Sequence, residues 1–144
     1  MELKLIGGAL YMDNMSKEEK QEILDFFGKI VILNVRDRAL KISMDIVQQK
    51  TLNPVKVSQY EGIAGLTSLQ KEAVCDLLSE TVTDTIYRFM EMFEQNSSKM
   101  KIVVKYEGKD FDLSQLSEAM GSEIACFDED GWIQKFSKIG RFIL

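Results

Sequence analysis

Four acidic residues recur at four-residue intervals within one long segment of the chain: Glu72, Asp76, Glu80 and Asp84. On an α-helix, residues four apart are neighbours on one face, so these carboxylates form an acidic stripe. Each like-charged pair at this spacing disfavours the helix by roughly 0.2 to 0.5 kcal/mol. A cationic protein that covered the stripe would remove this repulsion. The pattern therefore predicts a docking surface for a basic partner.

Two other interpretations of the acidic stripe stay open: a solvated helix face, or part of a magnesium site that needs a second helix. The only candidate second helix carries Glu18, Glu19, Glu22 and Asp25. Their EExxExxD pattern resembles the carboxylate motif of the helical nucleotide pyrophosphatases. Those enzymes carry a matching ExxD on another helix, whereas this chain has ExxxD at Glu72 to Asp76 and at Glu80 to Asp84. The resemblance implies magnesium-dependent nucleotide hydrolysis as an alternative function.

A second acidic cluster lies near the C-terminus, where Asp128, Glu129 and Asp130 precede Gly131 and Trp132. An aromatic residue ringed by carboxylates is typical of an interface hot spot, so one interpretation is a partner-binding loop. The alternative is an acidic turn with Trp132 packed in the core. The cluster does not match the pattern of a calcium loop, because the alternating oxygen ligands and the terminal glutamate of an EF-hand are missing.

The composition restricts the chemistry of the chain. It contains no histidine, which excludes histidine-dependent triads and removes the commonest metal ligand. Cys75 and Cys126 lack CxxC spacing, so we expect buried, reduced thiols and no metal site or cofactor. A formal charge of -5 opposes binding to nucleic acid and to anionic membranes. We therefore expect no catalytic residues.

The 144 residues suit a single domain spanning 1–144. Ser16 and Glu19 have capping-box spacing, and apolar residues then recur at steps of three and four. This pattern predicts a helix from about 17 to 49. The alternative is a strand over Ile30 to Val35 (IVILNV), which is rich in β-branched residues.

A second long helix is predicted from about 67 to 95. Thr67 and Gln70 again have capping-box spacing, and an apolar stripe follows them. Residues 51–66, which contain Pro54, form a linker. Because this linker is short, we expect the two long helices to pack antiparallel.

Residues from about 100 to 144 are predicted to be β-rich. Two interpretations stay open for residues 2–12: a short strand or a poorly ordered terminus. Lys101 to Tyr106 and Phe111 to Leu113 predict a hairpin. A short helix is expected over 114–119, ended by Gly121, and a third strand over 123–127. Trp132 begins either a short helix, which we favour, or a last strand. The predicted fold class is α+β: two long antiparallel helices packed with a small antiparallel sheet and short C-terminal helices.

The runs LLSETVTDTIYRFMEMFE and KIVVKYEGKDFDLSQLSEAMGSEIACFDEDGWIQKFSK resemble small bacterial proteins of the toxin-immunity type. This resemblance covers the second half of the chain and carries over no functional residue. It implies a non-enzymatic cytoplasmic inhibitor that binds and blocks a cognate toxin. The short apolar start, with an early lysine, is unlike a secretory signal, which agrees with a cytoplasmic protein. A third hypothesis is an adaptor or structural subunit, and the oligomeric state stays open.

Overall fold

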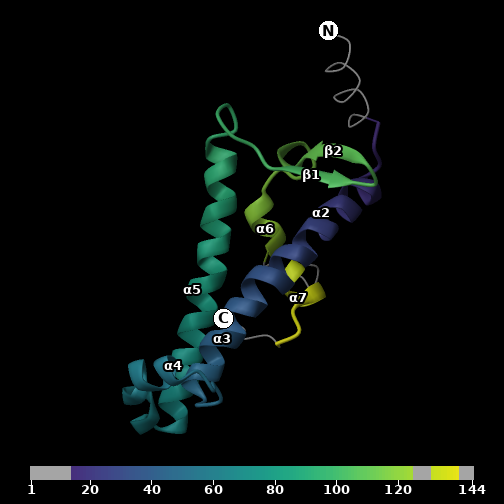
Figure 1. Cartoon of the computed structure of the whole chain (residues 1–144). Coiled ribbons are helices and arrows are strands. Elements are labelled where there is room, and N and C mark those ends of the chain that lie inside the picture. Colours follow the sequence, from purple (N-terminus) through teal and green to yellow (C-terminus); the bar gives the residue numbers. More distant parts are fainter. Residues whose placement is uncertain (1–13, 125–130, 140–144) are drawn as a thin grey trace.

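The computed structural model describes residues 14–124 and 131–139 (Figure 1). It is mostly helical, with a small two-stranded antiparallel sheet and short C-terminal helices. The strand predicted over 2–12 lies outside the described residues. In chain order the elements are α2 (Lys17–Val31), the π-helix η1 (Ile32–Asp37), α3 (Arg38–Val47), α4 (Pro54–Gln59), the 3-10 helix η2 (Glu61–Gly65), α5 (Ser68–Gln95), β1 (Val103–Tyr106), β2 (Lys109–Asp112), the 3-10 helix η3 (Leu113–Gln115), α6 (Met120–Ile124) and α7 (Trp132–Phe136).

The first long helix is partly confirmed, because α2, η1 and α3 follow one another without a break from Lys17 to Val47. Its capping box is present: Ser16 Oγ accepts a hydrogen bond from the Glu19 amide at 3.1 Å, and the Ser16 amide donates one to the Glu19 carboxylate at 2.7 Å. The strand alternative over 30–35 is wrong. The β-branched run instead coincides with the change to the wider π-helix, in which hydrogen bonds span five residues.

The second long helix is confirmed in its start and its end. Gln70 N donates to Thr67 Oγ1 at 3.2 Å, and Thr67 N donates to Gln70 Oε1 at 2.9 Å. The predicted linker is not featureless, since it contains α4 and η2. Asn53 caps α4, and Pro54 occupies its first turn, where a missing N–H costs nothing.

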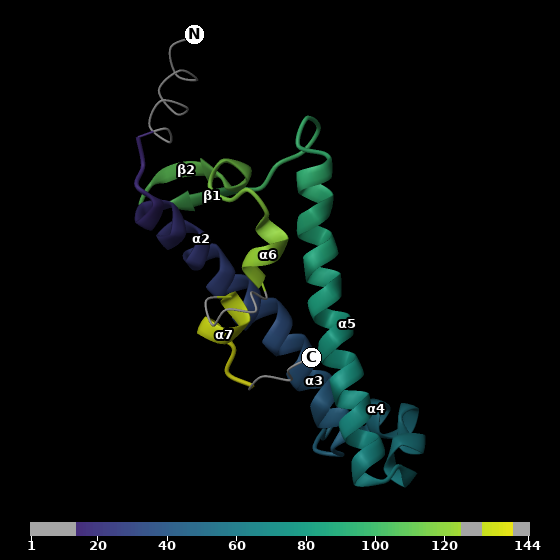
Figure 2. The same cartoon turned by 180° about the vertical axis from the view of Figure 1, so that it is seen from behind.

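The two long helical segments form the arms of a V (Figures 1 and 2). They run in opposite directions, as predicted, but α3 contacts α5 only near the vertex, where Leu40, Met44, Val47 and Cys75 form a small core. Towards the sheet the arms separate, and α6 lies between them against α5. The antiparallel packing is therefore confined to one end.

The larger core joins α2 to the sheet, α6 and α7. Trp132 of α7 is fully buried in it and packs edge-on against Phe27, with ring centroids 5.9 Å apart. Its indole covers the backbone of Gly28, where any Cβ would overlap the ring. Glycine at position 28 is therefore what allows α7 to reach α2.

The hairpin is confirmed, and the helix favoured at Trp132 is observed as α7. Val104 pairs with Phe111, and Glu107 and Gly108 form the two-residue turn, both with positive φ.

Two other C-terminal predictions are wrong. Glu123 and Ile124 belong to α6, so no strand begins at 123; residues 125–127 lie outside the described part. The helix expected over 114–119 is a single 3-10 turn, Leu113–Gln115. Gly121 does not end a helix but lies inside α6, where the ring of Tyr87 occupies the space of a Cβ. The close approach of the Tyr87 ring, and not the end of a helix, explains the glycine at position 121.

Candidate protein-binding face

The acidic stripe lies on α5, as predicted, and all four of its residues are exposed. The helix is held in place by a different side, which buries Cys75, Ser79, Ile86 and Met90. Burial of these residues against α3, η1 and α6 fixes the rotation of α5. The carboxylates are therefore displayed by a rigid element and not by a loop.

The members of the stripe differ in their electrostatic partners. Arg88 Nε donates to the Asp84 carboxylate at 2.9 Å, one helical turn away. This hydrogen bond and the charge of Asp84 raise the pKa of Arg88. Within the described part of the chain, no lysine or arginine forms an ion pair with Glu72, Asp76 or Glu80. Three of the four predicted residues thus carry charge that the described residues leave uncompensated.

The structure describes only part of the loop that was predicted to bind a partner. Asp128, Glu129 and Asp130 lie outside the described residues, so their role stays a prediction. Trp132 is fully buried, which contradicts its prediction as a binding anchor. Its large apolar surface is used to fix α7 on α2, as the core alternative expected.

Two of the four acidic residues of α2, Glu22 and Asp25, have partners on other elements. Glu19 caps its own helix, Glu22 accepts a hydrogen bond from the Tyr106 hydroxyl at 2.8 Å, and Asp25 pairs with Lys135 at 2.9 Å. The start of α2 lies beside the sheet, whereas the start of α5 lies at the vertex (Figure 2). In residues 14–124 and 131–139, no group of three or more acidic or cysteine side chains is placed to hold a metal ion. The two helices do not form the shared site that a magnesium-dependent hydrolase needs.

Sequence reasoning missed a buried polar cluster around Arg36, which is 1% exposed. Its guanidinium donates to Thr83 Oγ1 at 3.0 Å, to Ser79 Oγ at 3.2 Å and to the Asp37 carboxylate at 3.1 Å. Burial lowers the pKa of Arg36, and the charge of Asp37 opposes that shift. The only signal in the sequence is a charged RDR run inside an apolar segment.

Asp37 extends this cluster to the C-terminal segment. Its carboxylate accepts hydrogen bonds from Ser137 Oγ at 2.8 Å and from Lys138 N at 2.7 Å. The cluster therefore ties η1, α5 and the chain after α7 together. Because each polar group has a partner, the arrangement is one of structural support.

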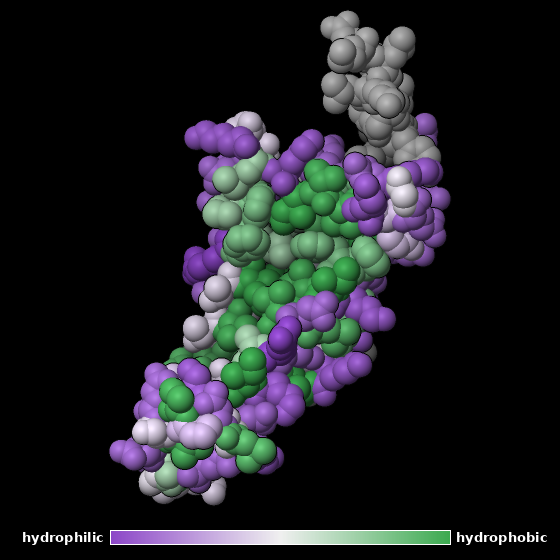
Figure 3. All heavy atoms as spheres, viewed as in Figure 1, coloured by the Kyte–Doolittle hydropathy of each residue, from purple (hydrophilic) through white to green (hydrophobic). Residues whose placement is uncertain are grey.

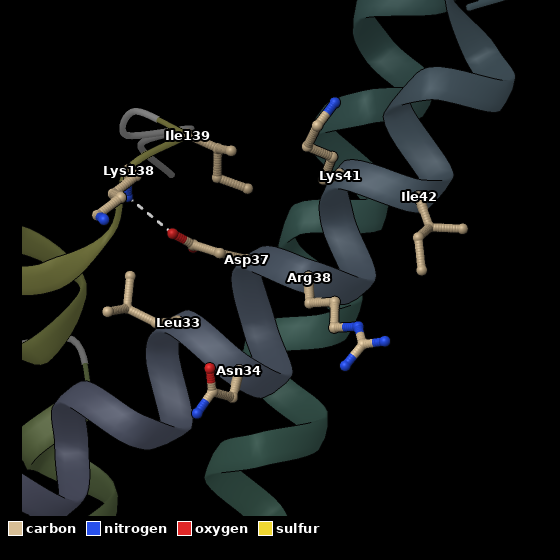
Figure 4. Close-up of a pocket in the computed structure, with 8 residues that line it drawn as sticks. All are labelled: Leu33, Asn34, Asp37, Arg38, Lys41, Ile42, Lys138 and Ile139. Carbon is tan, nitrogen blue, oxygen red and sulfur yellow. Dashed lines mark hydrogen bonds between the residues drawn. The ribbon is translucent and has the colours of Figure 1, made fainter. Parts of the chain in front are cut away.

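A shallow pocket of about 670 Å³ opens beside this cluster (Figure 4). Its lining includes three cations, Arg38, Lys41 and Lys138, on a chain of net negative charge. Their side chains point in different directions, and Lys41 pairs with Asp45 at 2.9 Å. An anion site needs donors that converge on one point, so this pocket does not provide one.

Cys75 is buried, as predicted, while Cys126 lies outside the described residues. Burial, together with the neighbouring charge of Asp76, raises the pKa of the Cys75 thiol. A thiol in this state is a poor nucleophile, because the thiolate is the reactive form.

Comparison of the chain with protein-family models, with curated proteins and with solved structures found no match. Among the described helices, none has the length and apolar character needed to cross a bilayer.

Proposed function

We propose that this protein is a non-enzymatic, cytoplasmic protein-binding module of the immunity or inhibitor type, and that the acidic stripe on α5 binds a basic partner such as a toxin. The observation that carries the proposal is the set of three exposed carboxylates, Glu72, Asp76 and Glu80, none of which forms an ion pair with a described lysine or arginine. A cationic partner would supply the opposite charge that the described residues do not place against these carboxylates. Blocking a basic cleft requires no catalytic group.

The physical basis is electrostatic steering. Carboxylates in a row on a rigid helix, on a chain of charge -5, attract a cationic surface over several ångströms and raise the association rate. Salt screens this attraction over about 8 Å at physiological ionic strength. The complex is therefore expected to form more slowly as the salt concentration rises.

The experiment is an affinity capture from native lysate with two matched double variants. Glu72→Lys with Glu80→Lys reverses the stripe, whereas Glu61→Lys with Glu118→Lys makes the same change of net charge at exposed positions elsewhere. Wild type and control should capture the same basic protein, and the stripe variant should lose it or associate at least about tenfold more slowly. Circular dichroism confirms that each variant is folded.

Equal capture and equal salt dependence for all three proteins would reject the stripe as the docking face. Asp128, Glu129 and Asp130 would then be the next residues to reverse. An adaptor differs from an inhibitor in one respect: it forms a stable complex without reducing the activity of its partner. An activity assay of the captured protein, with and without this chain, separates the two.

A further inference from the structure

Hydrophobic side chains gather on the face of the molecule that Figure 3 shows, over both arms of the V. Six large apolar residues on these arms have 38 to 56% of their surface exposed. We call them the apolar ridge: Phe26, Ile30, Val35, Ile42, Phe89 and Met92. None belongs to the acidic stripe.

The first arm turns its part of the ridge away from the core. Trp132 packs against Gly28, and α7 lies behind α2 in the view of Figure 1. Phe26 and Ile30 are each two residues from Gly28, which places them about 160° around the helix from that contact. The ridge on α2 therefore faces the viewer in Figures 1 and 3.

On α5 the ridge and the acidic stripe lie on opposite sides. Tyr87 is 41% exposed and its ring touches Gly121 of α6, so it lies at the border between the buried side of α5 and solvent. Glu80 is seven residues before Tyr87, which is about two turns, so it points in nearly the same direction as Tyr87. Phe89 is two residues after Tyr87 and lies about 160° away. A partner on the ridge would leave the stripe open.

The exposed area of the ridge is similar to the apolar area that one chain contributes to a standard dimer interface. Apolar residues of this size present roughly 150 to 200 Å² each when fully exposed, so the ridge exposes about 500 Å². A standard interface buries about 800 Å² on each partner, of which about 60% is apolar. The apolar part of such an interface is thus close to what the ridge offers. The largest apolar patch on a typical monomer is roughly 300 to 600 Å² and is often functional, and the ridge falls within that range.

We propose that the apolar ridge binds a second copy of this chain, face to face, in a dimer with two-fold symmetry. In a dimer with two-fold symmetry the same patch of both chains forms the interface, so the ridge of one chain would pack on the ridge of the other. Front-to-front packing also places the two acidic stripes on the outer sides, which keeps their like charges apart. The dimer then presents two stripes to basic partners, so that a partner with two sites would bind with higher avidity.

The test is the molar mass in solution, measured by light scattering and by sedimentation over a range of protein concentrations. Wild type is expected to have twice the mass of one chain. Ile30→Asp with Phe89→Asp should convert it to a monomer with unchanged circular dichroism. Leu69→Asp with Leu77→Asp is the matched control, because both leucines are at least as exposed and lie on other sides of α5. This control should remain a dimer.

Three outcomes would overturn the dimer: a wild type that is monomeric at all concentrations, a dimer that the ridge variant leaves intact, or equal dissociation of the ridge and control variants. A truncation that removes residues 2–13 tests whether the N-terminal segment, in place of a second copy, covers the ridge. If wild type is a monomer and the truncated chain dimerises, the N-terminal segment, and not a second copy, covers the ridge. A monomeric ridge variant that still captures the basic partner leaves the proposed function standing.

Discussion

Two helices of this molecule, α2 and α5, carry rows of carboxylates, and the two rows differ in their interactions with the rest of the protein. On α2, Glu22 and Asp25 bind a tyrosine from the hairpin and a lysine from α7. On α5, Glu72, Asp76 and Glu80 have no ion pair with a described residue. The difference comes from tertiary structure, because the hairpin and α7 fold back onto α2.

This comparison separates carboxylates that stabilise the fold from carboxylates that remain available to a partner. A paired carboxylate should destabilise the protein when it is neutralised. An unpaired one in a like-charged row should stabilise it. The predictions below test this difference in sign, and the largest effect concerns the element that brings the lysine to α2.

Trp132→Ala should destabilise the protein by about 3 to 5 kcal/mol, since it removes a fully buried indole and leaves a cavity against Gly28. Loss of α7 packing would also separate Lys135 from Asp25. Chemical denaturation followed by far-UV circular dichroism measures the free energy of unfolding. Trp132→Phe keeps part of the apolar contact and should cost less. Equal stability of Trp132→Ala and wild type would mean that the packing of α7 on α2 does not stabilise the fold.

Asp25→Asn should destabilise the protein by about 1 kcal/mol, because the ion pair with Lys135 is partly buried, with side chains 26% and 27% exposed. The double variant with Lys135→Met should show that the two effects are not additive. Denaturation curves of the single and double variants give the coupling free energy. Full additivity would mean that this contact contributes nothing.

The parts of the fold that the sequence predicts are those set by local signals. Ser16 with Glu19, and Thr67 with Gln70, fix the starts of both long helices, and the Glu107 to Gly108 turn fixes the hairpin. Gly121 and Trp132 were misjudged in part because their roles depend on contacts with Tyr87 and Gly28, which are distant in the sequence. The exposure of the stripe followed from helical periodicity, but the partners of Asp25 and Glu22 did not.

Asp76→Asn should stabilise the protein by roughly 0.4 to 1 kcal/mol, because it removes the repulsion of Asp76 with both Glu72 and Glu80. Added salt should raise the thermal midpoint of wild type more than that of the variant, since salt screens the same repulsion. Thermal unfolding at low and high ionic strength measures this difference. Destabilisation by Asp76→Asn would show that Asp76 has a stabilising contact and would place α5 in the same class as α2.

The smallest effect concerns Tyr106, the hydroxyl partner of Glu22. Its hydrogen bond to Glu22 raises the pKa of Tyr106 above the ordinary value of 10, with smaller contributions from burial and from the charges of Glu22 and Glu107. A pKa raised in the folded state adds stability that is complete below pH 10 and is lost as the pH rises through the folded value.

Wild type should therefore lose more stability between pH 9 and pH 12 than Tyr106→Phe, measured by urea denaturation at each pH. Tyr60→Phe is the control, because it removes a tyrosine hydroxyl elsewhere and leaves the contact between Tyr106 and Glu22 in place, so the pH dependence that this contact causes should persist. If Tyr106→Phe also follows wild type, the hydroxyl does not bind the carboxylate in solution. Glu22 would then be as free as the carboxylates of α5, and the contrast between the two helices would rest on Asp25 alone.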